Sequence, residues 1–275
     1  MEGNKEITNG LGDFPLDEVK EKMGKMIAGM NEMKKLQFKG KLVCDKKLFG
    51  ILLGAVSAMR KIPGIDRPLP IDGLYTSNSE EEKQIFEKHL KDKYGITDYQ
   101  SFIDVCNKLY NTQETYNQFT LYWKGMEPFD LSKLSEGGRK AFDKSEEMAR
   151  FFSQYVQKHG FYAWDCSEKV IVSKCAYACG IIEEEDFYDL VEGMTDRVLA
   201  MYSSWYEYAV SLICGATYFI YQRSGFDGKQ AKNMFDLMYN LVEGLFLNGK
   251  ANLWLRFEWY GAVQNQMTEK TEIAK

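Results

Sequence analysis

Apolar side chains recur every three or four residues along most of this chain, which is the spacing of an amphipathic α-helix. No long run of alternating polar and apolar residues predicts a β-strand, and only segments 36–44 and 161–163 could be short extended pieces. The pattern therefore predicts an all-α protein, folded as a single irregular multi-helical domain of about nine helices. We expect these helices over residues 13–36, 45–61, 79–94, 98–109, 139–158, 164–179, 183–203, 205–223 and 227–247.

Residues that start and stop helices support these boundaries. Ser79 and Glu82 form a capping-box sequence at the start of one helix, and Gly95 follows its end. Further glycines follow four of the later helices, at positions 160, 180, 225 and 249. The 5 prolines all precede residue 129, so the C-terminal half contains no strong helix breaker.

The first predicted helix is amphipathic and rich in methionine. Its apolar stripe consists of Val19, Met23, Met26, Met30 and Met33. A methionine stripe either binds protein partners adaptably or packs against the body of the protein, and packing is the commoner use. We therefore divide the chain into an N-terminal segment, 1–38, that carries this helix and a helical domain, 39–275.

Composition and charge exclude several classes of protein. The chain has 275 residues, 35 basic against 40 acidic, and its net charge of −5 argues against nucleic-acid binding. Its longest apolar stretches are about a dozen residues, too short to span a bilayer. The 6 cysteines form no C-x-x-C motif and no signal peptide precedes them, so we expect reduced cysteines and a soluble, cytoplasmic protein.

Motifs for metal, cofactor or nucleophilic chemistry are incomplete. His89 and His159 stand alone, so neither a metal site nor a catalytic triad is predicted. Residues 244–250 resemble a P-loop, but Ala251 replaces its Ser or Thr and the segment lies in a predicted helix. We therefore expect no cofactor, and the missing motifs argue against an enzyme without deciding the question.

Acidic residues gather on one face of the helix predicted over 183–203. They are Glu185, Asp189, Glu192 and Asp196, and apolar residues occupy the opposite face. A solvated helix face explains them without any ligand. The alternative is a surface that docks a basic protein partner.

Two tryptophan–acid pairs are the strongest candidates for a site. Trp164 precedes Asp165, and Trp205-Tyr206 precedes Glu207, each near a predicted helix start. One interpretation is that the acids stabilise helix N-termini. The other is that both carboxylates line an aromatic pocket, where burial would raise their pKa and permit acid catalysis. The aromatic residues expected to define the core or pocket are Trp164, Trp205, Tyr206, Trp254 and Trp259.

The same segments resemble a known family. The blocks 163–165, 180–182 and 202–207, followed by Gly215, are similar to motifs of the bacterial domain of unknown function 1266, and residues 94–98 resemble its Trp-Gly-Ile segment. The resemblance covers about residues 48–260 and implies a mostly helical, cytoplasmic bacterial protein without an established activity. The family pattern has arginines where this chain has Glu168 and Ala216, so this chain lacks two side chains that could serve an anionic ligand.

These observations lead to two functional hypotheses. The first is a non-enzymatic helical domain that acts through protein partners or self-association, motivated by its acidity and its methionine stripe. The second is a small-molecule-binding or hydrolytic protein that uses Asp165 and Glu207 in an aromatic pocket.

Overall fold

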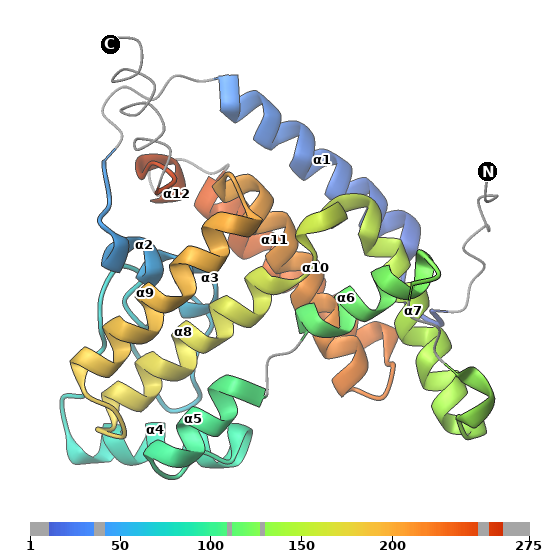
Figure 1. Ribbon diagram of the computed structural model, residues 1–275. Helices are drawn as coiled ribbons and strands as arrows, with labels where there is room; N and C mark the ends of the chain where they lie inside the picture. Colours follow the sequence, from blue (N-terminus) through green and yellow to red (C-terminus); the bar gives the residue numbers. More distant parts are fainter. Residues whose placement is uncertain (1–10, 36–41, 109–111, 127–129, 247–252, 261–275) are drawn as a thin grey trace, which may run out of the picture.

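The fold consists of α-helices joined by short loops and 3-10 turns (Figure 1). The computed structural model describes residues 11–35, 42–108, 112–126, 130–246 and 253–260. Within these ranges the one strand-like pairing is an isolated parallel bridge between Leu42 and Phe257, so the predicted all-α, irregular multi-helical domain is confirmed. The helices are α1 (Leu16–Lys35), α2 (Lys46–Leu52), α3 (Ala55–Ala58), α4 (Glu80–Tyr94), α5 (Tyr99–Lys108), α6 (Thr112–Trp123), α7 (Glu136–Val156), α8 (Tyr162–Ala178), α9 (Glu184–Met201), α10 (Trp205–Arg223), α11 (Gly228–Phe246) and α12 (Leu253–Arg256).

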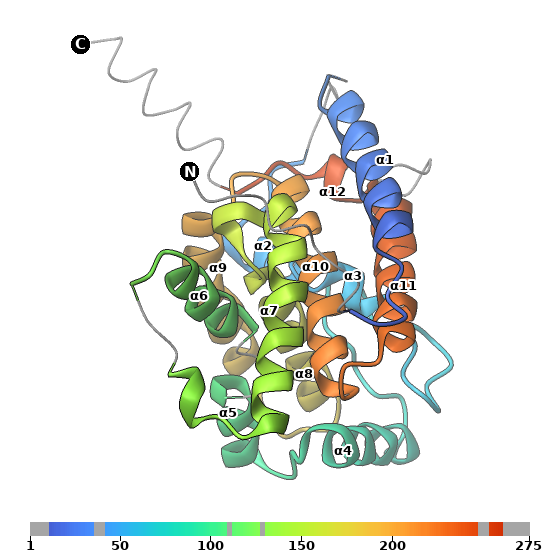
Figure 2. The same ribbon diagram turned by 90° about the vertical axis from the view of Figure 1, so that its right-hand side faces the viewer.

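Helix α8 lies at the centre of the molecule. Figure 2 shows α8 and α10 behind α7, with α6 and α9 to one side and α1 and α11 to the other. Because other helices surround it, α8 is buried along nearly its whole length. It nevertheless carries three acidic or basic side chains that are almost fully buried, Asp165, Glu168 and Lys174. Burying charged groups is unfavourable unless they are paired, so these residues mark places where chemistry or specific bonding is concentrated.

The N-terminal helix packs against the body through its methionine stripe. Val19, Met23, Met26 and Met30 are buried, so the packing interpretation of this stripe is confirmed. Ion pairs also join α1 to α11, since Lys22 and Glu18 contact residues of α11 at 2.7 and 2.9 Å. The boundary predicted between segments 1–38 and 39–275 falls outside the described residues and stays a prediction.

Three details of the predicted pattern differ from the structure. The helix expected over 45–61 is divided into α2 and α3 around Gly54, where a Cβ atom would lie 2.5 Å from Val170 Cγ1 of α8. An extended segment over 161–163 was the wrong expectation, because α8 already begins at Tyr162. Helices α6 and α12 were not predicted at all, and the N-terminal amides of α6 are bound by a side chain of α8.

A cluster of tryptophans packs between α2, α10 and the segment around α12. The rings of Trp205 and Trp254 stack at 5.1 Å with an interplanar angle of 9°, and Trp259 meets Trp205 edge-on at 4.9 Å. Trp254 Nε1 donates to the carbonyl oxygen of Leu52 at 3.1 Å. These contacts hold the segment around α12 against α2 and α10, so these three tryptophans act in the core.

Candidate functional site

Asp165 is a buried helix cap. Its side chain is 1 % exposed, and its two carboxylate oxygens accept hydrogen bonds from the backbone amides of Thr112, at 3.2 Å, and Gln113, at 2.9 Å. It therefore binds the start of α6 from the first turn of α8. Burial raises the pKa of Asp165 to about 7, and the hydrogen bonds from α6 oppose this rise.

Glu207 also bonds to a helix start, but at a different place. Ser204 is the N-cap of α10, and the Glu207 carboxylate accepts from Ser203 N at 2.6 Å and Ser203 Oγ at 2.9 Å. Its other oxygen lies 3.9 Å from His159 Nε2. Glu207 and Tyr206 line a small pocket of about 140 Å³ beneath α1. Asp165 is not among the residues that line this pocket, so the structure does not place the two carboxylates in one cavity.

Trp164 lies in a different environment from Trp205, Trp254 and Trp259. It lines a pocket of about 320 Å³, which we call the Trp164 pocket. The residues that line this pocket come from the turn after α3 and from α4, α8, α10 and α11. They are Arg60, Lys93, Tyr94, Trp164, Glu168, Phe219, Ile220, Arg223 and Met234. A volume of this size and a mixture of aromatic and charged walls are typical of small-molecule sites.

Close packing fixes the tryptophan in the wall of this pocket. At Gly215 of α10, a Cβ atom would lie 2.7 Å from Trp164 Cβ and 3.0 Å from Phe161 O, so only glycine allows the two helices to approach this closely. The Trp164 ring meets Phe219 at 5.6 Å, and the Arg60 guanidinium lies over it at 5.3 Å. Among the described residues, none accepts a hydrogen bond from its buried indole N–H.

The pocket combines a buried ion pair with an exposed cationic rim. At its base Arg60 pairs with Glu168, whose side chain is only 3 % exposed. Lys93 and Arg223 lie at the exposed edge, and desolvation lowers the pKa of Lys93. Three cationic side chains therefore face one carboxylate, and the pocket carries a net positive charge in a protein that is acidic as a whole.

Most of these residues could not be identified from the sequence. Arg60, Lys93 and Arg223 come from three distant segments, and nothing in their local spacing indicates a common site. Trp164 and Tyr94 did belong to segments singled out by their motifs, but only the packing of α4 against α8 brings these segments to one pocket.

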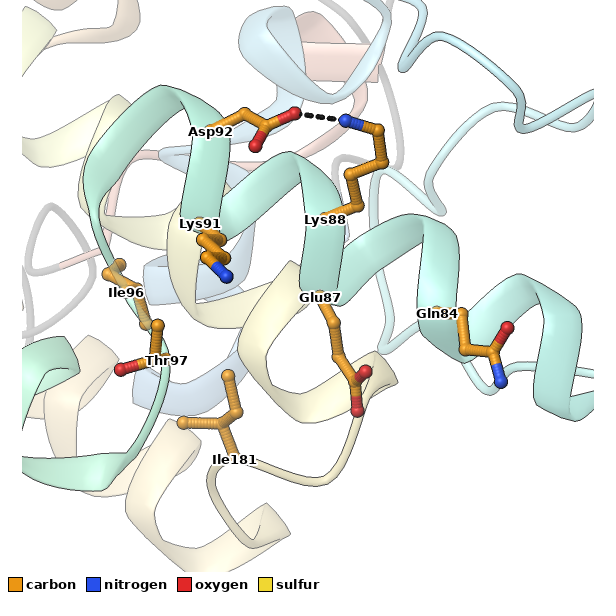
Figure 3. Close-up of a pocket in the computed structure, with 8 residues that line it drawn as sticks. All are labelled: Gln84, Glu87, Lys88, Lys91, Asp92, Ile96, Thr97 and Ile181. Atoms are coloured by element: carbon orange, nitrogen blue, oxygen red, sulfur yellow. Dashed lines mark hydrogen bonds and ion pairs between the residues drawn. The ribbon is translucent and has the colours of Figure 1, made fainter.

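A second, wider hollow lies on the surface along α4. Figure 3 shows Lys88 and Asp92 joined by an ion pair, and Glu87 extending from α4 toward the loop that carries Ile181. The hollow measures about 520 Å³, and its charged side chains are exposed and of both signs. It offers neither a buried polar group nor an aromatic wall, so we regard the Trp164 pocket as the better candidate site.

These features define an all-α protein whose buried central helix forms one wall of an amphipathic pocket. A family model described as "Protein of unknown function (DUF1266)" matches residues 89–259, and the chain belongs to this family. The match includes all residues of the Trp164 pocket except Arg60. No curated protein and no solved structure matches the chain. Within the described residues, no helix is both long enough and apolar enough to cross a membrane.

Proposed function

We propose that this protein is a non-enzymatic ligand-binding domain that receives a small organic molecule in the Trp164 pocket. The observation that carries this proposal is the pocket itself, where a buried tryptophan and a buried ion pair share one cavity of about 320 Å³. Such pockets use aromatic surface for affinity and a few polar groups for orientation. A catalytic acid must reach its substrate. Asp165 is buried and does not line this pocket, so its position favours ligand binding over hydrolysis.

The test is a screen of small organic molecules by thermal unfolding, with direct calorimetry on every molecule that stabilises the protein. The blocking variant is Ile220→Trp, which places a large ring at a half-buried position in the pocket wall. The matched control is Leu237→Trp, the same new side chain at a 41 % exposed position of α11 that does not line the pocket. Stabilisation of the wild type and the control, but not of Ile220→Trp, is expected. Equal stabilisation of Ile220→Trp, or no binding at all, would refute the proposal.

A protein-interaction role is the second candidate function. The observation that favours it is the acidic face of α9, which includes Glu185, Glu192 and Asp189; Glu185 and Asp189 are exposed and Glu192 is half-buried. Neutralising these three residues to Gln, Gln and Asn should abolish capture of a basic partner in a pull-down, while Ile220→Trp should not affect it. Unchanged capture by the neutralised protein would count against this face. Light scattering decides separately whether the protein self-associates.

The cysteines support a cytoplasmic location for either function. All six are free thiols, and the five that are buried pack in the apolar interior. Burial raises the pKa of Cys166 and Cys175 to about 12, so these thiols are unreactive. Free cysteines are typical of reducing compartments.

A further inference from the structure

We propose that the occupant of the Trp164 pocket is a flat organic anion, with its ring system against Trp164 and Phe219 and its acidic group facing Lys93 and Arg223. This inference rests on the ligand-binding function proposed above and adds the chemical class of the ligand.

The first argument is the charge of the pocket. Arg60 and Glu168 neutralise each other at the base, so their charges are already compensated. Lys93 and Arg223 have no ion-pair partner among the described residues, and each lies instead near an aromatic ring, at 4.8 Å from Tyr94 and 5.9 Å from Phe219. Two cations at the edge of one cavity attract an anionic group, and hydrogen bonds between ionised partners are the strong ones.

The partial desolvation of Lys93 also favours an anionic ligand. Its side chain is exposed at the rim, yet the atoms packed around it displace enough water to lower its pKa, and Glu168 opposes this shift. An anion that enters the pocket would supply the missing counter-charge. The carboxylate of Glu168 would repel that anion, but it is held by Arg60 and lies on the buried side of the cavity.

The second argument is the shape and surface of the walls. The apolar sides come from Trp164, Phe219, Ile220 and Met234, and the Trp164 and Phe219 rings are only 5.6 Å apart. Aromatic rings and thioether groups make favourable contacts with flat ring systems. A flat apolar body with one acidic group therefore matches both parts of the pocket, whereas inorganic phosphate would leave the apolar walls uncovered.

The experiment compares three probes that share one ring system and differ in charge. They are 2-naphthoate, the neutral 2-naphthamide and the cationic 2-naphthylmethylamine, each titrated into the full chain by calorimetry. We expect 2-naphthoate to bind about tenfold more tightly than the amide, a factor that corresponds to one charge-assisted contact, and the amine not to bind. Lys93→Met and Arg223→Met should each weaken 2-naphthoate binding about fivefold, the factor for an ion pair near the surface. The matched control is Lys91→Met, which removes the same charge from an exposed position of α4 outside the pocket and should leave the affinity within about twofold.

The outcomes separate this inference from the ligand-binding function. If the amide or the amine binds as tightly as the acid and Ile220→Trp blocks it, the anion proposal is wrong and the ligand-binding function stands. If 2-naphthoate binding is insensitive to Lys93→Met and Arg223→Met, the acidic group does not face these residues and the proposal is wrong. If none of the three probes binds, the anion proposal is overturned, and the screen with Ile220→Trp decides the ligand-binding function independently.

Discussion

Removing the Asp165 carboxylate should destabilise the protein strongly, although Asp165 touches neither the pocket nor the solvent. In Asp165→Ala, the amides of Thr112 and Gln113 lose their acceptors in a buried environment. Each unpaired buried donor costs about 1–3 kcal/mol, and relief from burying a carboxyl group offsets part of this. We expect a loss of about 3 kcal/mol, or about 5 °C in Tm for a chain of this length.

The measurement is urea unfolding followed by circular dichroism, with an exposed helix cap as the control. Asp98 accepts from Ser101 N at 2.8 Å at the start of α5, on the surface. Asp98→Ala should therefore cost only about 1 kcal/mol, as exposed caps do. A loss for Asp165→Ala that does not exceed the loss for Asp98→Ala would refute the reasoning that burial makes this cap important.

Asp165→Asn keeps the shape of the cap but removes its titratable carboxylate, and it replaces one of the two acceptor oxygens by an NH2 group. The pKa of Asp165 is about 7 in the folded protein, above its usual value of 3.8, so the folded state holds more protons than the unfolded state between these pH values. The wild type should therefore lose stability relative to Asp165→Asn as pH rises from about 4 to 7, by up to about 1.4 kcal/mol per pH unit. A difference between the two proteins that is constant from pH 5 to pH 8 would show that Asp165 does not titrate in this range.

Three further predictions concern the core. Gly215→Ala should destabilise the protein by about 2 kcal/mol in urea unfolding, because its Cβ would overlap a neighbouring helix. Gly193→Ala is the control: its Cβ meets no atom within 4 Å, so this variant should be more stable by about 0.5 kcal/mol. Equal effects of the two substitutions would contradict the packing argument. Lys174→Met should be more stable than the wild type at pH 7, because burial lowers the lysine pKa to about 8. Loss of the hydrogen bond from Lys174 Nζ to Pro70 O offsets part of this gain and leaves about 1 kcal/mol. The wild type should gain stability from about pH 8 to 10.5 and the variant should not, so parallel pH profiles of the two proteins would exclude this titration. Trp205→Leu should lose about 3 kcal/mol with its stacked ring, and a loss below about 1 kcal/mol would mean that the cluster repacks.

The boundaries of most helices followed from local chemistry. Ser79 accepts from the amide of Glu82 at 3.2 Å, and Gly95 ends α4 with a φ of 74°, as the capping pattern predicts. Such features act within one or two helical turns, so neighbouring residues are sufficient to determine them. Helix α6 escaped prediction because its N-terminal cap is Asp165, which lies more than fifty residues further along the chain.

The sequence by itself determined the all-α class, most helix ends, the buried face of α1 and the family, because each depends on periodicity or on short motifs. Only the tertiary structure decided what the tryptophan–acid pairs do. It separated Asp165 from the pocket of Glu207, assigned Trp205 to the core, and joined Trp164 to Arg60, Lys93 and Arg223 in one cavity. The physical reason is that a pocket is built from side chains on several packed helices, and their meeting depends on how the helices cross.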